Sequence, residues 1–515
     1  MAGWSLAARG GDMSDWGSGY ITDSAYVHDF CRVQTPPMLA LAALAGGVES
    51  VGGAGEPLSY CDLGCGQGYT ANIVAAANPA ARVFGYDFNP GHIANARALA
   101  SEAGLANVQF REASFAELAG EGAPQSFDMI ALHGIFSWIS TDNRRSLVAL
   151  IGQWLKPGGL LYISYDCMPG WAGVAPLRRI LARSFAPRPG LSSPAALERA
   201  LSYSDALRAA DSRFHRMFPN VEAQLERLKN TPRAYLSHEL LTREWEAFCF
   251  GQVADALAEA KLVYIGSAHL TDGVDRVNFT APQLEFLAGI DDPVLAEETR
   301  DMLLSRQFRR DIFVKGRPAS NPARLRERWL DTRFVLTAPE ADFDMCFDTA
   351  LGKMQLRSEI HGPLIESLRK GPVTLREMLK FSPESAAHWT SLVDAIKILV
   401  GRGDVQPALP FAGEAARAES VRAFNGAVLA RATESGELTH LASPVTASGV
   451  AVDRLAQLYL LARRRGLGDP AKIVTKLLEG AAPEGEGDTA GASAAEQVGR
   501  IENKVAPLLA RLGIE

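Results

Sequence analysis

The sequence lacks long apolar runs, has few cysteines and carries no excess of positive charge. It contains no run of the ~18 apolar residues that a membrane-spanning helix needs, so we predict no membrane insertion. Six cysteines spread over 515 residues do not form a disulfide framework, which favours a cytoplasmic location. A net charge of −7 argues against nucleic acid as a partner, and residues 1–11 do not resemble a signal peptide. The rest of the composition, 47% hydrophobic and 22% charged, is that of a globular protein with several domains.

A glycine-rich turn is the most informative motif in the chain. Residues 62–68 read DLGCGQG and place Gly64, Gly66 and Gly68 at every second position after the acidic Asp62. Glycines let the backbone turn tightly and let a ligand approach the main chain closely. A dinucleotide-binding turn would need its third glycine at position 69, which is Tyr69. The spacing instead resembles the first motif of class I S-adenosylmethionine (SAM) methyltransferases.

Two cysteines next to this turn have the separation of a pair of metal ligands. Cys61 and Cys65 are not followed by a second pair of cysteines, which a zinc site of this type would need. We interpret them as small residues that pack the junction between strand and helix, and we predict no metal.

Short apolar strands alternate with helices over about a hundred residues. The run at 127–133 (FDMIALH) is almost wholly apolar, as expected for a parallel sheet that is covered on both faces. The alternation predicts an α/β fold with a Rossmann-like, doubly wound sheet. A Lys-Pro-Gly-Gly turn at 156–159, typical of the region before the fifth strand of class I methyltransferases, also favours SAM over NAD. The expected strands are 58–61, 82–87, 108–110, 127–133 and 160–165, and the expected helices are 69–78, 90–103 and 141–154.

The sheet is expected to finish only after a long helical insertion. Residues 175–240 read as helices interrupted by prolines, and a further helix is expected at 245–260. Two short strands, at 262–266 and 277–279, would then complete the sheet.

The remaining chain is expected to form smaller parts. Three helical patterns and a short strand at 343–409 predict a winged-helix-like domain, but the third helix, 389–400, carries only one basic residue, which argues against DNA binding. Residues 483–493 read as a disordered linker and 500–512 as a short helix. The predicted boundaries are a flexible N-terminus at 1–18, a SAM-binding core at 19–174, a helical insertion at 175–240, the end of the sheet with a regulatory region at 241–316, a winged-helix-like domain at 317–410 and a helical C-terminal region at 411–515 with a linker near 481–495.

Side chains at the ends of three strands are the candidates for holding SAM. Asp62 would lie near the ammonium group of the cofactor, or merely cap the turn. Asp87 ends the second strand and could accept hydrogen bonds from both ribose hydroxyls, although NAD proteins share that position. Phe88, and Ser114 with Phe115 after the third strand, could form the adenine slot; the two aromatic residues could instead belong to the core.

Methyl transfer requires an unprotonated nucleophile aligned with the departing sulfur. His133, after the fourth strand, could act as a base, orient a hydrogen bond beside the cofactor, or be structural. Tyr165 and Asp166, at the end of the fifth strand, could align an amine. Trp138 and Trp171 could wall an apolar slot that lowers the pKa of a lysine amine, or could pack in the core.

Two longer runs give the chain a family resemblance. Residues 127–138 (FDMIALHGIFSW) and 162–171 (YISYDCMPGW) resemble methyltransferases that carry a methyltransferase regulatory domain. Rickettsial protein-lysine methyltransferases belong to that group. The resemblance extends to YLSHE at 235–239, to residues 264–269 and to RQFRRD at 306–311, and it covers roughly residues 14–316.

The resemblance implies a SAM-binding core, added middle and C-terminal domains, a homodimer and protein lysine as a methyl acceptor. Tyr20 and Tyr26, in the tyrosine-containing lead-in, would be substrate-binding residues. Two departures bear on the acceptor. Asp166 stands where the family commonly has asparagine, and the lead-in carries His28, Phe30 and Cys31 where aromatic residues are frequent.

Three functions follow from this interpretation. The first is N-methylation of protein lysine by direct in-line transfer. The second is O- or N-methylation of a small metabolite or surface glycan. The third is a SAM-binding regulatory protein with little or no catalytic activity.

Overall fold

The computed structural model describes most of the chain. The described residues are 21, 27–49, 57–122, 124–185, 191–339, 343–381, 389–466, 469–481 and 496–514. The predictions for residues 1–18, Tyr20 and Tyr26, and nearly all of the linker predicted near 481–495, lie outside them. The described residues divide into two compact units: a sheet unit drawn from residues 28–136, 141–169 and 248–515, and a helical unit drawn from residues 21, 27, 137–140 and 170–247.

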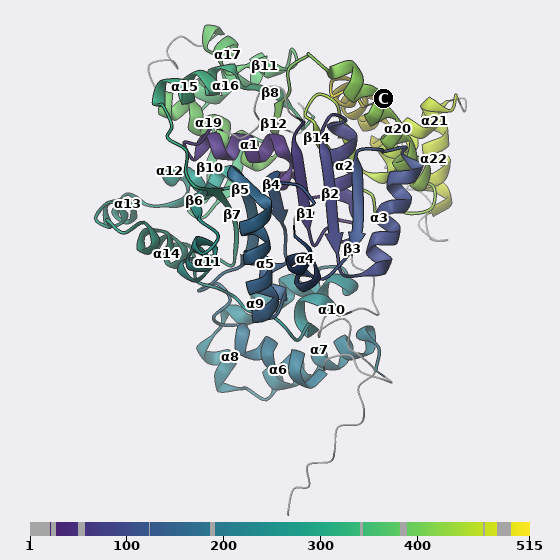
Figure 1. Ribbon diagram of the computed structural model, residues 1–515. Helices are drawn as coiled ribbons and strands as arrows, with labels where there is room; N and C mark the ends of the chain where they lie inside the picture. The colour runs from purple at the N-terminus through teal and green to yellow at the C-terminus, as the bar shows by residue number, and fades with distance from the viewer. Residues whose placement is uncertain are drawn as a thin grey trace, which may run out of the picture. The chain divides into compact units, whose positions relative to one another are not determined.

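A seven-stranded sheet organises the sheet unit (Figure 1). The strand order is β3-β2-β1-β4-β5-β7-β6, with the first five strands parallel and β7 antiparallel to both of its neighbours. This confirms the doubly wound α/β fold predicted from the sequence. The strands are β1 (Ser59–Leu63), β2 (Arg82–Asp87), β3 (Val108–Glu112), β4 (Phe127–Leu132), β5 (Leu155–Asp166), β6 (Leu262–Ser267) and β7 (Phe308–Lys315).

The central strands are apolar because they are buried on both faces. Every residue of β1 and β4 is buried, including Asp128, whose carboxylate accepts a hydrogen bond from Ser59 and pairs with Lys156 at 2.8 Å. The predicted Lys-Pro-Gly-Gly turn lies inside β5, where Gly158 has a φ of 75°. The helices that alternate with the strands are α2 (Tyr69–Ala77), α3 (Pro90–Glu102), α4 (Phe115–Glu121), α5 (Thr141–Trp154) and α11 (Phe250–Ala258).

The predicted end of the sheet is half correct. β6 joins the sheet as expected, but the strand predicted at 277–279 is wrong, because residues 275–278 form the short helix α12 (Asp275–Asn278). The strand that completes the sheet is β7, which the pattern analysis did not identify. Its sequence, FRRDIFVK, has charged residues at Arg309 and Asp311, both of which are buried, so it lacks the apolar signature of its neighbours.

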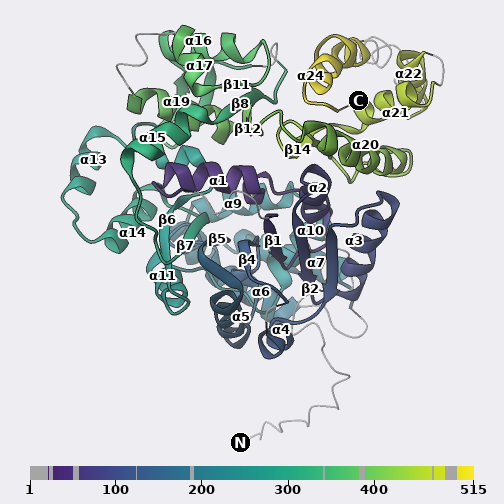
Figure 2. The same cartoon turned by 45° about the horizontal axis from the view of Figure 1, so that its top comes forward.

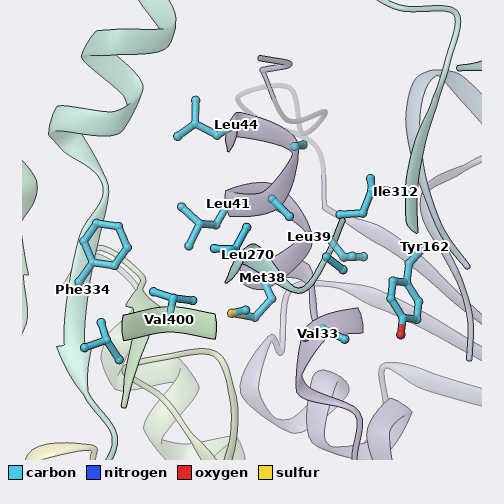
Figure 3. Close-up of a cluster of buried hydrophobic side chains, with 14 of the residues drawn as sticks. Val33, Met38, Leu39, Leu41, Leu44, Tyr162, Leu270, Ile312, Phe334 and Val400 are labelled. Carbon is cyan, nitrogen blue, oxygen red and sulfur yellow. The ribbon is translucent and has the colours of Figure 1, made fainter. Parts of the chain in front are cut away.

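The helix α1 (Pro36–Ala45) was not predicted and lies at the centre of the larger hydrophobic core. Figure 3 shows Leu39 facing Ile312 and Tyr162 of the sheet, while Met38 and Leu41 face Phe334 and Val400 of the C-terminal part. Contact on opposite sides explains why its sequence, PPMLALAALA, is apolar all round rather than amphipathic. Prolines at its start and the Gly46-Gly47 pair at its end were available signals.

Between β6 and β7 the chain forms a helical connection. A 3-10 turn follows β6 directly and places residues 269–273 next to the sheet edge, so that it can contribute side chains there. The elements are the 3-10 turn η3 (Leu270–Gly273), α12, α13 (Ala281–Ala288) and α14 (Pro293–Leu304).

The part of the chain predicted to be winged-helix-like combines helices with a small antiparallel sheet of order β11-β8-β12 (Figure 2). The three predicted helical patterns are present, and the winged-helix assignment itself stays a prediction. The elements are α15 (Pro322–Asp331), β8 (Arg333–Leu336), the hairpin β9 (Cys346–Thr349) and β10 (Gly352–Gln355), α16 (Ser358–Leu368), β11 (Val373–Thr374), α17 (Leu375–Phe381), α19 (Trp389–Arg402) and β12 (Val405–Ala408).

The C-terminal region was predicted to be helical, and the structure corrects this in one place. It contains a β-hairpin that packs on α2, the helix that follows the glycine-rich turn: the Tyr69 hydroxyl donates to the carbonyl of His440 and accepts from its N–H. The hairpin strands are rich in alanine and serine, so tertiary packing rather than strand propensity accounts for them. The elements are α20 (Glu414–Arg431), β13 (His440–Ser443), β14 (Ser448–Ala451), α21 (Arg454–Arg464), α22 (Pro470–Ala481), a π-helical turn (Ile501–Val505) and α24 (Ala506–Arg511).

The helical unit contains five of the six helices described between β5 and β6, in the region where an insertion was predicted. Within it, α10 packs against α6, α7 and α9 (Figure 1). These helices are α6 (Ala175–Phe185), α7 (Ser193–Ala209), α8 (Arg213–Met217), α9 (Asn220–Lys229) and α10 (Arg233–Leu241). In the described part of the chain, none of the helices combines the length and apolarity needed to cross a bilayer.

Candidate functional site

The glycine-rich turn connects β1 to α2 in the conformation that its spacing predicts. Gly64, Gly66 and Gly68 have φ values of 76°, 52° and 69°, in the left-handed region that favours glycine. A Cβ on Gly68 would lie 2.4 Å from the Cβ of Ala96, so this glycine is required by packing against α3. A Cβ on Gly66 would meet nothing within 4 Å, so the space in front of this residue is open to a ligand. Gly66 is therefore the point of the turn where a bound molecule can contact bare main chain.

Asp87, at the end of β2, joins the turn through its carboxylate. One oxygen accepts a hydrogen bond from the Gly66 N–H at 2.9 Å, and the other accepts from the Asn89 N–H at 2.9 Å and lies 3.2 Å from Nδ1 of His92. Each carboxylate oxygen has two lone pairs, so Asp87 keeps acceptor capacity for a hydroxyl. The structure thus brings two of the predicted cofactor elements, the turn and the acid, into direct contact.

Asp62 lies beside them and is only 3% exposed. No described residue donates a hydrogen bond to its carboxylate. Burial raises the pKa of Asp62 to about 7, the nearby Asp87 raises it further, and His133 opposes the shift. A buried carboxylate without a donor is costly, and a cationic group placed next to it would offset that cost.

His133, directly after β4, is held by polar side chains of β5 and the lead-in. Its Nδ1 lies 2.8 Å from the Tyr162 hydroxyl, 3.1 Å from Oγ of Ser164 and 3.5 Å from Sγ of Cys31. Burial lowers the pKa of His133 to about 4, with the charge of Arg310 contributing in the same direction. The imidazole is therefore neutral at physiological pH.

A cavity of about 310 Å³ opens next to His133. Its polar lining comes from segments far apart in the sequence, and includes Asp29, Cys31, His133, His269 and Arg310. Sequence analysis had named only His133 of these as a site residue. His269 and Arg310 fall inside segments that carry the family resemblance, which was the one available signal for them.

The structure separates Tyr165 from this cavity. Tyr162, Ser164 and Asp166 share one face of β5 with His133, whereas Tyr165 points to the other face and its hydroxyl donates to Asp311 at 2.7 Å. Tyr165 is fully buried in an ion network, so its placement gives it a structural contact rather than access to an acceptor. Asp166 is on the His133 face and is 5% exposed, where the prediction of an aligning role stays untested.

The two predicted substrate-binding tryptophans belong to the helical unit and surround a buried arginine. The Arg178 guanidinium lies 5.2 Å from the ring centroid of Trp138 and 4.4 Å from that of Trp245, and Trp171 packs edge-on against Trp245 at 5.1 Å. Arg178 also donates to the carbonyl of Glu239 at 2.8 Å. These contacts favour the interpretation of both tryptophans as packing residues.

The positions of Phe88, Ser114 and Phe115 support the predicted adenine slot only in part. Ser114 caps α4: it accepts from the Glu117 N–H, and the Glu117 carboxylate accepts from the Ser114 N–H at 2.7 Å. Its hydroxyl is therefore engaged by the helix. Phe88 and Phe115 are both half-buried, so they fill neither the core nor a closed slot.

Taken together, the residues around the turn fit SAM. Gly66 offers open main chain, Asp62 offers a buried carboxylate that lacks a donor, and Asp87 offers acceptors at the end of β2. These are the groups that a ligand with an ammonium, a carboxylate and ribose hydroxyls needs.

Replacing Asp87 by alanine is expected to weaken SAM binding by about 1.5–3 kcal/mol, because charge-assisted hydrogen bonds are lost. Isothermal titration calorimetry measures the change, roughly 10- to 150-fold in Kd. Glu112, which ends the adjacent strand β3 in register with Asp87, supplies the control: Glu112→Ala should bind as the unmodified protein does. Equal affinity of both variants would mean that the ribose is held elsewhere.

Comparison with known proteins identifies two family regions. A methyltransferase domain model matches residues 55–183, and a model described as a predicted methyltransferase regulatory domain matches residues 232–315. The second match covers β6, β7 and the helices between them, so the segment that completes the sheet is the one the regulatory-domain model describes.

Several proteins resemble the chain over part or most of its length. An uncharacterized protein of Synechocystis is 38% identical over 88% of this chain and 89% of its own. A trans-aconitate 2-methyltransferase of Methylobacterium nodulans is 29% identical over 35% of this chain and 65% of its own. The structure of PKMT2 from Rickettsia typhi in complex with AdoHcy superposes with a TM-score of 0.68 over 95% of this chain and 99% of that one, at 17% identity. The last comparison establishes a shared fold.

Proposed function

We propose a protein lysine as the methyl acceptor of this chain, which belongs to the class I SAM-dependent methyltransferases that carry a methyltransferase regulatory domain. SAM is the cofactor of that family, and methyl transfer is its reaction. The proposal for the acceptor is supported by the fold shared with PKMT2, a rickettsial protein-lysine methyltransferase, along nearly the whole chain. The homodimer and the cytoplasmic location expected from the sequence stay predictions.

One observation carries the proposal: the cavity next to His133 disfavours positive charge on a base. Burial is the main cause that holds His133 neutral; Arg310 acts in the same direction, and the charge of Asp29 opposes both. A lysine ammonium entering the same cavity would meet the same burial and the same guanidinium, which lower the pKa of its amine. Only the neutral amine has the lone pair that attacks a methyl group.

Each residue of the site would have its own role in the proposed reaction. When bound, SAM supplies an electrophilic methyl group on a sulfonium. Asp62 would pair with the ammonium group of the cofactor, and Asp87 and Gly66 would hold its ribose and methionine ends. His133, fixed by Tyr162 and Ser164, would border the methyl position and orient the incoming nucleophile without titrating.

A second acceptor class is favoured by a specific feature of the same cavity. Among the described residues, no carboxylate lies within ion-pair distance of Arg310, whose guanidinium stacks 4.9 Å from the Phe308 ring centroid. An arginine without an acid can bind a carboxylate. The similarity to trans-aconitate 2-methyltransferases makes O-methylation of a small carboxylic acid the alternative.

Labelled SAM added with cell lysate separates the candidate functions. If lysine in protein is the acceptor, label enters acid-precipitable material and is released by protease. Label in the small-molecule fraction would support the carboxylic acid alternative. Tight SAM binding with no label in any fraction would indicate a regulatory protein without turnover.

Arg310→Gln is expected to distinguish the acceptors by its kinetic signature. If lysine is the acceptor, loss of the Arg310 cation raises the pKa of the lysine amine. The rise of kcat with pH then occurs about one pH unit higher, and the shape of the profile is unchanged. With a carboxylate acceptor, the profile stays in place and KM rises roughly 10- to 150-fold, the scale of a lost charge-assisted hydrogen bond. A variant unchanged in both would exclude Arg310 from the acceptor site.

A further inference from the structure

We propose that His269, oriented by Asp272, is the base that removes a proton from the acceptor ammonium before methyl transfer. This proposal rests on the proposed lysine acceptor, because a protonated amine is what requires a base. His269 precedes η3 and, like His133, lines the 310 Å³ cavity. Its side chain is 34% exposed, so it can meet an acceptor and exchange a proton with solvent.

His269 also lines a second cavity of about 620 Å³. The second cavity shares His269 and Gly401 with the first, and is otherwise walled by residues of η3, α12, the β9–β10 hairpin and the end of α19. A base at the junction of the two cavities can be approached from either. This position suits a group that receives a proton on one side and releases it on the other.

Asp272 holds the imidazole by its Nδ1. That nitrogen lies 3.3 Å from one carboxylate oxygen of Asp272 and 3.0 Å from the Thr271 hydroxyl. The other oxygen of Asp272 accepts from Ser267 at 2.9 Å and from Arg306 at 3.0 Å. Burial would raise the pKa of Asp272, but the hydrogen bond from His269 and the charge of Arg306 outweigh it and hold the pKa below its ordinary value. Asp272 therefore stays ionised and orients the imidazole of His269.

His133 does not offer the same chemistry. Its Nδ1 is already engaged by Tyr162 and Ser164, and no carboxylate pairs with it among the described residues. Its pKa of about 4, caused mainly by burial, makes it too weak a base to accept a proton from an ammonium near neutral pH. The two histidines of the cavity thus have different environments: one is buried beside hydroxyls, and the other is paired with an acid.

The charged groups that face His269 come from several elements. In the first cavity they are Asp29 and Arg32 of the lead-in and Arg310 of β7, with the thiol of Cys31 and the imidazole of His133. In the second cavity they are Asp348 of the β9–β10 hairpin, together with Arg402 and Asp404, which pair with each other at 2.7 Å. Asp348, in the second cavity, can attract a cationic amine toward the base.

The proposed step balances in charge and atoms. One N–H bond of the lysine ammonium breaks, its proton moves to Nε2 of His269, and the electron pair stays on the amine. The amine then forms an N–C bond to the methyl carbon as the C–S bond breaks, and the electron pair of that bond leaves with sulfur. The imidazolium, paired with Asp272, returns its proton to solvent.

His269→Ala tests the proposal through the pH profile. Tritiated SAM and cell-lysate protein serve as substrates, and initial rates of label into acid-precipitable protein are measured from pH 6 to 10. Loss of a general base is expected to lower the rate about 10²- to 10⁴-fold at pH 7. The variant should then rise tenfold per pH unit to the top of the range, because free amine must form without help. Added imidazole should restore part of the rate, a response that a structural role would not give.

Two controls separate the possible outcomes. SAM affinity of His269→Ala, measured by calorimetry, should match that of the unmodified protein, and His215→Gln, a histidine of α8 in the helical unit, should keep the full profile. If the unmodified protein labels lysine and His269→Ala labels it equally fast near neutral pH, His269 is not the base, whereas the lysine proposal stands. If the unmodified protein labels no protein, the lysine proposal fails and this inference fails with it.

Discussion

Replacing Arg309 by glutamine is expected to destabilise the protein by about 3–5 kcal/mol, because removing one member of a buried ion network leaves uncompensated charge. Arg309 is 4% exposed and pairs at 2.8 Å with each of Asp311, Asp301 and Glu297. It joins β7 to α14, and through Asp311 it reaches Tyr165 of β5. The network therefore fixes β7, the strand that completes the sheet and carries the cavity residue Arg310.

The pH dependence of that loss has a definite sign. Burial raises the pKa of both Asp301 and Asp311, and the charge of Arg309 opposes the shift. Without Arg309 the folded state would bind more protons than the unfolded chain, so the variant loses stability as pH rises. Urea denaturation should therefore show a larger difference from the unmodified protein at pH 8 than at pH 5.

An exposed arginine with similar partners provides the control. Arg376 pairs with Glu327 and Asp331 at the surface of the C-terminal part, where solvent screens the charges. Arg376→Gln should leave the denaturation midpoint unchanged. If Arg309→Gln also loses less than about 1 kcal/mol, the value typical of surface pairs, then the network does not hold β7 in place.

SAM binding is expected to depend on pH through Asp62. Its pKa of about 7 means that the carboxyl is largely protonated at pH 5.5 and largely ionised at pH 7.5. Only the ionised form attracts the ammonium group of the cofactor, so Kd should be at least about tenfold weaker at pH 5.5 than at pH 7.5. Binding below pH 7 should also release a proton, which calorimetry detects as a dependence of the heat on buffer ionisation enthalpy.

Asp62→Asn should abolish this dependence and bind weakly across the range. Asp128→Asn is the matched control, because Asp128 is an equally buried acid that pairs with Lys156 at the start of the neighbouring strand. Asp128→Asn should keep the pH dependence. A pH slope that survives in Asp62→Asn would assign the titration to another group and remove Asp62 from the cofactor site.

The local sequence pattern was sufficient to predict the parallel strands of the sheet and the glycine-rich turn. Strands such as β4 are recognisable because both faces are buried, and the spacing of Gly64, Gly66 and Gly68 requires a particular backbone. β7 was not predicted because its buried charges pair with residues of α14, and a short stretch of sequence does not show such a contact. The strand predicted at 277–279 was wrong because a run of three residues is too short to distinguish a strand from a helical turn.

The residues of the candidate site also fall into those that the sequence predicted and those that it did not. Asp62 and Asp87 lie at the carboxyl ends of β1 and β2, and His133 directly follows β4, so topology alone placed them together at one sheet edge. Arg310 and His269 enter the cavity from the segment that completes the sheet, so their role depended on a register that the sequence did not disclose. Tyr165 was misplaced because alternation along β5 sends it to the opposite face from Ser164.

The chemical form of the transferred label tests the central claim most directly. Protein labelled from tritiated SAM is divided into two parts, one treated with mild base and the other hydrolysed to amino acids and analysed by mass spectrometry. We predict that the label resists base and is recovered as N-methyl-lysine. Label released by base as methanol would reveal a methyl ester and contradict the lysine acceptor.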